Sequence, residues 1–476
     1  MRNLRALALP AVIAVVTACT VGPDHRVPEL DLPERFVADE TAGVTGEPPA
    51  LTTNLWTAFD APELAALIQR AREHNADIAV ATATLDASRA LAGLQVFSLF
   101  PTITAQTEQE RIRQSGQDPF TFPGLDVAEF YRAGFDASWE IDLFGSLRRQ
   151  AESIRRRVEA DTYALYAVEL TVVAETAQAY FQWQGQSLRV ELLERNLAAQ
   201  RDSVEILSVA LEAGRGTALD VERARVQERQ LASTLPAART ARMAALQRLA
   251  VLTGQLPGEL SAALASTEQF PPMPRLVAAG SPESWLARRP DIASAERRLA
   301  EINALIGVSK AELYPKLTLL GSFGWTGTSA SVVGDSSGER WRTAPTLSWR
   351  FLDFGRVKRE IKEAEAQTAG ALATFEQTWR LAIEETENAL ANYRAAGETV
   401  LALREAVDAS KRAVELSNLR YQNGADSYFT VLDAERESLD LQDRYALAEI
   451  DQATALAALY KALGGDFVEA PVVAKQ

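Results

Sequence analysis

The chain has 476 residues and a formal net charge of −15, from 49 basic and 64 acidic side chains. This acidic balance argues against a nucleic-acid-binding protein, because no basic surface stands out that would neutralise phosphates. With two histidines and one cysteine, the chain also lacks the residues for a His/Cys metal site, a disulfide framework or a Cys–His catalytic pair. No phosphate-binding glycine loop or nucleophile motif is present, so we predict no enzymatic activity and no cofactor.

The N-terminus has the features of a secretory signal peptide, which we assign to residues 1–18. Two arginines precede an apolar run from Ala6 to Val16, which is too short to span a bilayer as a mature helix. Cys19 follows small residues directly, as in a bacterial lipobox; the alternative is a buried structural cysteine. We predict that Cys19 is acylated, and the acyl chains would anchor the protein in a membrane.

Residues 19–53 form a lipidated N-terminal arm that we predict to be extended. They are rich in Pro, Gly, Asp and Glu and show no hydrophobic period. Residues 54–100 follow with apolar residues at helical spacing, including Leu64, Leu67 and Ile68. We predict one helical region here, at the start of a first repeat that covers residues 54–254.

A strict alternation identifies the next element as a β-hairpin. Within residues 129–142, apolar and polar residues alternate from Ala133 to Ile141, and the apolar set is Ala133, Phe135, Ala137, Trp139 and Ile141. A period of two over this length predicts a strand with one apolar and one polar face. A similar alternation over Thr102–Thr107 predicts its partner strand, which we place at residues 101–112.

A helical hairpin of unusual length follows, at residues 146–252. Its first helix has no proline and extends to Glu212, about 100 Å at 1.5 Å per residue. Glycines at 214 and 216 predict a turn, and a second helix returns to residue 252. A Pro-rich linker at residues 255–280 ends the first repeat.

Residues 281–464 repeat this order of elements. Trp139 and Gly145 recur as Trp349 and Gly355, in both cases 210 positions later. Pro101 recurs as Pro315, 214 positions later. The repeat predicts strands at 315–326 and 340–352, a helical hairpin at 356–463 with a turn at Asn423-Gly424, and a C-terminal tail at 465–476.

Four strands of membrane-spanning length cannot close a barrel within one chain. An open sheet edge is not tolerated in lipid, because its N–H and C=O groups find no partner there. Two copies would supply about eight strands and three copies about twelve. The polar face would then line the lumen, and the apolar face would meet lipid through Phe135, Trp139, Trp325, Leu347 and Trp349. The alternative is a soluble sandwich attached to a coiled coil.

The whole mature chain resembles the outer-membrane factor (TolC-like) family, in its OprM/NodT-type efflux lipoprotein branch. The segment Cys19–Asp24, the two strand-to-helix joints and the two helix turns carry this resemblance. It implies an α+β, mainly α fold: two β-hairpins that contribute to a trimeric 12-stranded membrane barrel, and long coiled-coil helices that form a periplasmic α-barrel. It also implies a homotrimer that is lipid-anchored in the outer membrane, in contact with outer-membrane lipid and with most of the chain in the periplasm.

The function implied by the resemblance is the exit duct of a tripartite efflux system. The partners would be a periplasmic adaptor (membrane fusion) protein and an inner-membrane pump of the RND type. The alternatives are the outer-membrane duct of a type I protein secretion system, or a periplasmic coiled-coil adaptor or scaffold lipoprotein. A scaffold would not need two amphipathic hairpins of membrane length. Because selection happens in the pump, drugs, metal ions and secreted factors all remain open as substrates.

The resemblance implies two groups of site residues. The residues expected to meet the adaptor are those of the two helix turns: Ala213, Gly214, Arg215, Asn423, Gly424 and Ala425. The residues expected to form the periplasmic gate are Asp220, Tyr421, Phe429, Asp433 and Arg436. By themselves, the glycines predict only helix C-caps with positive φ, and Asp433 with Arg436 predicts an i, i+3 pair that could equally be a solvated surface pair.

The sequence departs from TolC at Asp426 (Arg in TolC) and Thr430 (Asp in TolC), and His25 replaces a family tyrosine, to which we assign no role.

Overall fold

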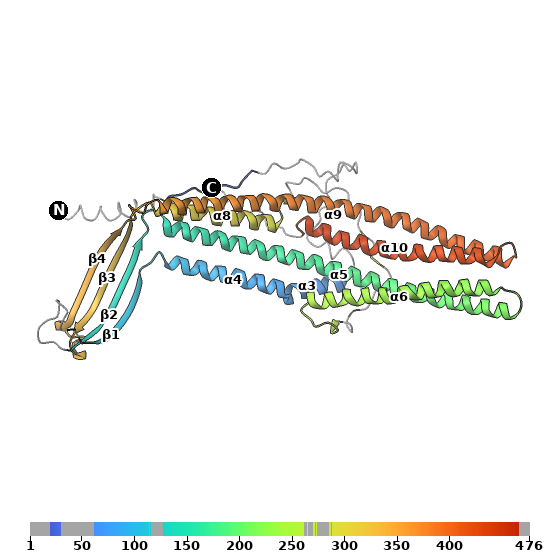
Figure 1. Ribbon diagram of the computed structural model, residues 1–476, viewed down its shortest axis with the longest axis horizontal. Coiled ribbons are helices and arrows are strands. Elements are labelled where there is room, and N and C mark those ends of the chain that lie inside the picture. The colour runs from blue at the N-terminus through green and yellow to red at the C-terminus, as the bar shows by residue number, and fades with distance from the viewer. Residues whose placement is uncertain are drawn as a thin grey trace. The chain divides into compact units, whose positions relative to one another are not determined.

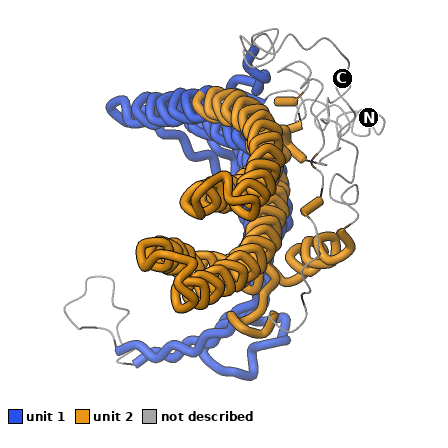
Figure 2. Tube along the Cα trace, turned by 90° about the vertical axis from the view of Figure 1, so that its right-hand side faces the viewer, with its two compact units in different colours: residues 1–29, 84–162, 294–376 blue, residues 30–83, 163–293, 377–476 orange. Residues whose placement is uncertain are grey.

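The computed structural model describes residues 20–29, 61–113, 115, 127–260, 264, 270–271, 273, 285–286 and 288–465. Cys19, the signal peptide and almost all of the predicted C-terminal tail lie outside the described residues. The chain divides into two compact units (Figure 2). Unit 1 comprises residues 1–29, 84–162 and 294–376, and unit 2 comprises residues 30–83, 163–293 and 377–476. Within the described residues, no helix combines the length and the apolar character needed to cross a membrane.

Unit 1 contains one antiparallel sheet in the order β1-β2-β3-β4 (Figure 1). Its strands are β1 (Thr102–Ile112), β2 (Ala128–Ile141), β3 (Lys316–Gly327) and β4 (Glu339–Ser348). Both predicted hairpins are present, and β2 also pairs with β3, which joins the two hairpins. β1 and β4 are therefore the edges of the sheet.

The sheet has one apolar and one polar face, as the alternation predicts. Register places Phe135 opposite Phe323 and Leu317 opposite Leu347, all on the apolar face. This face is exposed: Trp341, for example, keeps 72% of its surface accessible. On the polar face, one row crosses all four strands through Thr104, Asp136, Ser322 and Arg342.

The last strand is shorter than predicted, because it ends at Ser348 and not at residue 352. Trp349 lies beyond the strand, and its indole Nε1 donates to the Leu313 carbonyl at 2.9 Å. Arg350 next to it pairs with Glu312 at 2.8 Å. Trp139, the matching residue of the first repeat, stays inside β2 and donates to the Leu99 carbonyl at 3.0 Å. The same anchor therefore recurs in both repeats, although only Trp139 remains in a strand.

Two long helices begin directly after the sheet: α5 (Ser146–Glu212) and α9 (Arg356–Gln422). A glycine with positive φ precedes each one, Gly145 at 83° and Gly355 at 88°. A side chain would be strained in this left-handed conformation. An aspartate then caps each helix: Asp142 accepts from the Arg148 amide at 3.0 Å, and Asp353 accepts from the Val357 amide at 2.8 Å. These joints are where the repeat changes from strand to helix.

The helices of unit 1 meet around a buried carboxylate. Asp161 on α5 is 3% exposed and accepts hydrogen bonds from Ser88 on α4 (Ala76–Phe97) and from Arg298 on α8 (Pro290–Ala311). Because a buried carboxylate without partners is costly, this network fixes α4 and α8 against the first part of α5.

The arm at residues 20–29 is bound to unit 1. The Val21 amide donates to the Phe144 carbonyl at 3.2 Å, and the Arg149 guanidinium bonds to the Val21 carbonyl and to Asp24. His25 Nε2 lies 2.6 Å from a Glu296 carboxylate oxygen, with both side chains about nine-tenths buried. His25 therefore has a structural role in holding the arm, which the sequence did not suggest.

The predicted helical region 54–100 is broken into two helices. α3 (Pro62–His74) ends at Asn75, and α4 begins at residue 76. The Asn75 side chain caps α4 by accepting from the Asp77 amide at 2.8 Å and donates to the Leu252 carbonyl at 3.0 Å. Asn75 is 5% exposed, so the break is part of the packed core.

The core of unit 2 joins α3, α5, α6 (Ala218–Leu252), α9 and α10 (Tyr428–Ala462). Its fully buried side chains include Leu64, Phe181, Leu249, Leu390 and Leu456. A Cβ at Gly185 would lie 2.2 Å from Ile450, so glycine permits α5 and α10 to approach closely at this point. The Arg289 guanidinium adds a bond to the Ala462 carbonyl at 2.8 Å.

Candidate functional site

The two helix turns have the same backbone geometry. Gly214 and Gly424 both have φ of 69°. In the first turn, the Arg215 amide donates to the Ala210 carbonyl at 2.8 Å and the Gly214 amide to Leu211 at 3.0 Å. The second turn repeats both bonds 210 positions later, from Ala425 to Arg420 and from Gly424 to Tyr421, at 2.9 Å each. This is the Schellman arrangement that ends a helix on a left-handed residue.

The two turns differ in how the next helix starts. Thr217 caps α6 by accepting from the Asp220 amide, and its hydroxyl donates to the Asp220 carboxylate at 2.6 Å. At the start of α10, Ser427 makes no side-chain cap bond. There Arg420 pairs with Asp426 at 2.5 Å instead, and this bond lowers the pKa of Asp426. The departure from TolC at position 426 therefore produces an ion pair within the turn.

The predicted docking residues are all open to solvent. Ala213, Gly214 and Arg215 are exposed, and so are Asn423, Gly424 and Ala425. No atom lies within 4 Å of a Cβ built on either glycine. The glycines are therefore required for their backbone conformation and not by close packing.

Beyond the turns, a small core ties the two helical hairpins together. It consists of Leu207 on α5, Val221 and Ala224 on α6, and Leu432 on α10. All four side chains are at least nine-tenths buried. The first turns of α6 and α10 are thus held beside each other through this cluster.

Two of the predicted gate residues make aromatic contacts. The Tyr421 ring meets Tyr428 edge-on, with centroids 5.1 Å apart. The guanidinium carbon of Arg223 lies 4.6 Å from the centroid of Phe429, which joins α6 to α10 by a cation–π contact.

The other predicted gate residues do not join these contacts. Asp433 and Arg436 pair with each other at 2.6 Å, with side chains 54% and 65% exposed. A pair this exposed stabilises the fold by about 1 kcal/mol at most. Asp220 bonds to Thr217 in its own turn. Within one chain, the five predicted gate residues therefore take part in four separate contacts.

Sequence reasoning missed two residues in this region, Tyr428 and Glu435. Burial raises the pKa of both, and the nearby Glu435 carboxylate adds to the shift of Tyr428. One carboxylate oxygen of Glu435 is buried and has no hydrogen-bond partner among the described residues. Tyr428, Leu432 and Glu435 follow the spacing i, i+4, i+7, a signal that places Glu435 on the buried side of α10.

An apolar set also repeats at the turns. Ile206, Val209 and Leu219 in the first hairpin match Leu416, Leu419 and Phe429 in the second, each 210 positions apart. All six are exposed, from 48% at Phe429 to 68% at Ile206. Six large apolar side chains are thus left open near the two turns, a pattern typical of surfaces that contact another protein.

Comparison with known proteins identifies the family. The family model described as outer membrane efflux protein matches residues 67–255 and 281–465, one segment in each repeat. The chain belongs to the outer membrane efflux protein family. The resemblance to TolC-like outer-membrane factors is thereby confirmed, and so is the predicted localisation in the outer membrane.

Relatives of this family match over nearly their full length. Outer membrane protein OprJ of Pseudomonas aeruginosa is 31% identical over an alignment of 471 residues that covers 96% of this chain and 96% of OprJ. The solvent efflux pump outer membrane protein SrpC of Pseudomonas putida is 29% identical and covers 95% of this chain and 96% of SrpC. The solved outer-membrane channel OprN superposes with a TM-score of 0.86 at 34% identity, covering 94% of this chain and 99% of OprN. The fold and family are those of channel proteins.

Proposed function

We propose that three copies of this chain form the exit duct of a tripartite efflux system. The observation that carries the proposal is the amphipathic sheet with two unpaired edges, continuous with two long helices. An exposed apolar face suits lipid, the polar face suits a water-filled lumen, and the edges require other strands. Three copies of this four-stranded sheet would supply twelve strands.

The internal repeat predicts how neighbouring copies pair. A residue of β1 corresponds to the residue of β3 that lies 214 positions later, and a residue of β2 corresponds to the residue of β4 that lies 210 positions later. As a check, the pair Thr102 and Ser138 of the first hairpin maps onto Lys316 and Ser348, which are indeed paired in the second. Ala137 of β2 pairs with Gly321 of β3 within one chain. The residue that matches Ala137 in β4 is Leu347, and the residue that matches Gly321 in β1 is Thr107. We therefore expect Leu347 of one copy to pair with Thr107 of the next.

The repeat also predicts an aromatic contact between copies. Phe144 stacks on Tyr314 within one chain, with centroids 4.5 Å apart. Phe354 lies 210 positions after Phe144, and Phe100 lies 214 positions before Tyr314. We therefore expect Phe354 of one copy to contact Phe100 of the next. Both are uncovered in the single chain, Phe354 at 90% and Phe100 at 59%. A neighbouring copy would bury both rings.

We assign docking of a periplasmic adaptor to the two turns and gating to the contacts beside them. The six exposed residues of the turns and the repeated apolar set support docking. We expect the width of the periplasmic opening (the mouth of the duct) to depend on how the helical hairpins are held together. The contacts that support this are Tyr421–Tyr428, Arg223–Phe429 and Asp433–Arg436. Three copies of Asp433 close to a common axis would favour cations.

The same proposal includes acylation of Cys19 and an RND-type pump as the inner-membrane partner. Thr20, which directly follows Cys19 in the sequence, lies beside Gly145 at the first strand-to-helix joint. SrpC is described as part of a solvent efflux pump, which favours efflux of small molecules over protein secretion.

The test is reconstitution of the mature protein into planar bilayers. The proposal expects an SDS-resistant trimer from outer-membrane fractions that migrates differently after heating and that conducts ions when reconstituted. A soluble monomer without conductance would contradict the duct and favour a periplasmic scaffold.

A further inference from the structure

A cavity of about 410 Å³ lies in unit 1 where the arm meets the start of α5. Its charged lining consists of Arg148, Arg149, Arg155, Asp24 and Glu152, and it is completed by Thr20, Leu99 and Ala151. The cavity is far from the helix turns in the sequence, and neither the docking nor the gating proposed above uses it. Thr20, which directly follows the proposed acylation site Cys19, is part of its lining. The lining combines one buried guanidinium, Arg149, with charges that face solvent: the Asp24 side chain is 87% exposed, and Arg155 is exposed.

The charges of the cavity are only partly matched. Arg148 pairs with Asp142 at 3.2 Å. The buried Arg149 pairs with Asp24 at 2.7 Å and with Glu152 at 2.8 Å, so one cation serves two carboxylates. Among the residues that the structure describes, Arg155 forms no ion pair. The lining therefore carries one unmatched positive charge at Arg155 and one unmatched negative charge shared by Asp24 and Glu152.

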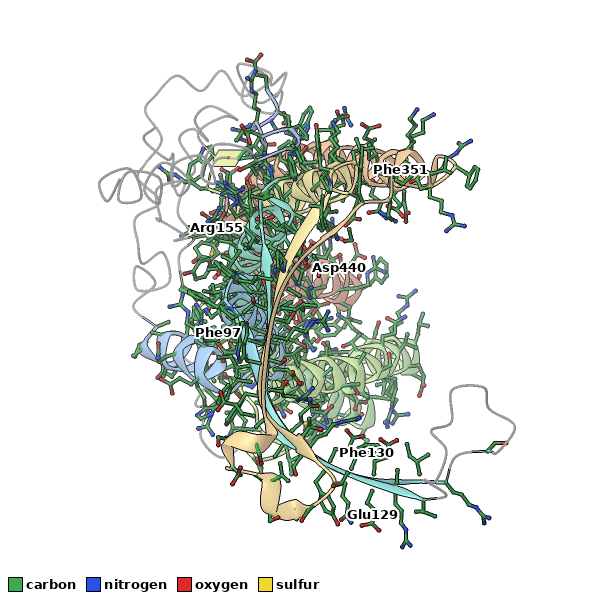
Figure 3. All side chains as sticks on the ribbon, turned by 90° about the vertical axis from the view of Figure 1, so that its left-hand side faces the viewer. Phe97, Glu129, Phe130, Arg155, Phe351 and Asp440 are labelled. Carbon is green, nitrogen blue, oxygen red and sulfur yellow. The ribbon has the colours of Figure 1, made fainter. Side chains whose placement is uncertain are left out.

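The position of the cavity corresponds to the headgroup layer of a membrane that surrounds the sheet. Arg148 lies three residues beyond Gly145, about 5 Å along the helix, and a headgroup layer is about 5–8 Å thick. Arg155 is about 15 Å along the helix, but helical side chains lean toward the N-terminus and so toward the membrane. Phe97 is 68% exposed and lies on the same side of unit 1 as Arg155 (Figure 3).

We propose that this cavity binds the zwitterionic headgroup of a phosphatidylethanolamine molecule in the inner leaflet of the outer membrane. The phosphodiester would accept hydrogen bonds from Arg155 and Arg148, because guanidinium groups match phosphate oxygens in geometry. The primary ammonium would donate to Asp24, whose side chain is 87% exposed, and to Glu152. The acyl chains would extend along Leu99 and Phe97 toward the sheet. This inference rests on the membrane orientation of the sheet in the proposed function.

The headgroup assignment is specific because each part of the lipid has its own partner. Phosphatidylglycerol offers the phosphate without the ammonium and would leave the carboxylates unmatched. Phosphatidylcholine has a quaternary ammonium that cannot donate hydrogen bonds. Inorganic phosphate lacks both the ammonium and the acyl chains.

The experiment uses the full-length mature trimer in detergent and counts bound lipid by native mass spectrometry. The probes are dihexanoyl-phosphatidylethanolamine, the matching phosphatidylglycerol and phosphatidylcholine, and inorganic phosphate as a competitor. We expect phosphatidylethanolamine to bind at one molecule per chain and the other two lipids about tenfold more weakly. Arg155→Gln should weaken phosphatidylethanolamine binding about tenfold, as loss of a charged hydrogen bond predicts. Arg155 is exposed, so this substitution leaves the fold intact, and the exposed Arg444→Gln on α10 is the control that should keep full affinity.

Equal affinity for phosphatidylethanolamine and phosphatidylglycerol would overturn the proposal, and so would unchanged affinity in Arg155→Gln. Full competition by inorganic phosphate would mean that the site takes free anions and would also overturn it. Single-channel conductance of the same samples is recorded in parallel. Loss of lipid binding with normal conductance rejects the site alone, whereas absent conductance with normal binding rejects the duct alone.

Discussion

The guanidinium of Arg223 lies over the ring of Phe429 and joins α6 to α10 at the turns. Exposed cation–π contacts contribute about 0.5–1 kcal/mol. Arg223→Gln should therefore loosen the mouth and raise single-channel conductance, without preventing trimer formation. Arg225→Gln is the control, because Arg225 pairs with Glu222 on its own helix. If both variants conduct equally, the Arg223–Phe429 contact has no part in gating.

The Asp433–Arg436 pair is a second test of the gate. Each single substitution, Asp433→Ala or Arg436→Ala, should raise conductance in planar bilayers, and Asp433→Ala should also reduce cation selectivity. Loss of an exposed pair changes unfolding stability by less than about 1 kcal/mol, so a change in conductance would report on the mouth. The exposed pair Asp440–Arg444 is the control, and unchanged conductance in both single variants would exclude the pair from the gate.

The register between copies can be tested by cross-linking. Thr107→Cys combined with Leu347→Cys should give a disulfide between copies, because directly opposite residues of antiparallel strands lie within disulfide reach. Thr107→Cys with Thr343→Cys is the control, since four residues along a strand add about 13 Å. Non-reducing electrophoresis of outer-membrane fractions reads the result. A cross-link in the control pair alone would show a different register.

Glu435 predicts a pH dependence of stability. Burial raises its pKa above the ordinary value of 4.5, so the folded protein holds this proton more strongly than the unfolded chain. The stabilising contribution is present at low pH and is lost as pH rises from 4.5 through the raised pKa. In Glu435→Gln, the thermal unfolding midpoint should decrease less with rising pH over this range than in the parent protein. In Glu437→Gln, a change at an exposed neighbour, the decrease should be the same as in the parent protein. An identical slope in all three proteins would contradict the assignment.

The turns predict a different result for each kind of substitution. Gly214→Ala meets no steric clash but must adopt positive φ, which costs about 1–2 kcal/mol. Asn tolerates this conformation better, so Gly214→Asn should be milder. Arg215→Ala should keep the turn and its stability but reduce cross-linking to an adaptor in cell envelopes. Full cross-linking in Arg215→Ala would remove Arg215 from the docking surface.

Much of the fold could be predicted because its signals are local or repeated. The alternation around Trp139 gives the strand and its faces, and the recurrence of Gly145 as Gly355 gives the second joint. Both turns follow from a glycine after a helix. These features depend on neighbours in sequence, so one chain suffices to find them.

The departures depend on contacts between distant residues. The helix break at Asn75 is stabilised by a bond to the Leu252 carbonyl, 177 residues away. The early end of β4 accompanies the bond from Trp349 to the Leu313 carbonyl. The partner of Phe429 was missed for the same reason, since Arg223 reaches it from another helix, whereas the local Asp433–Arg436 pair could be predicted from its spacing. The buried position of Glu435 could have been found from its heptad spacing with Tyr428.

The open edges of the sheet set an order of events during biogenesis. Helical hairpins rely on contacts between neighbouring residues and form quickly, whereas in the proposed trimer β1 and β4 complete their hydrogen bonds only when other copies arrive. During that interval each copy presents bare strand edges together with an exposed apolar face, a combination that favours aggregation. The time a newly exported copy waits for its neighbours, more than the stability of its own fold, would therefore limit how much channel a cell can build.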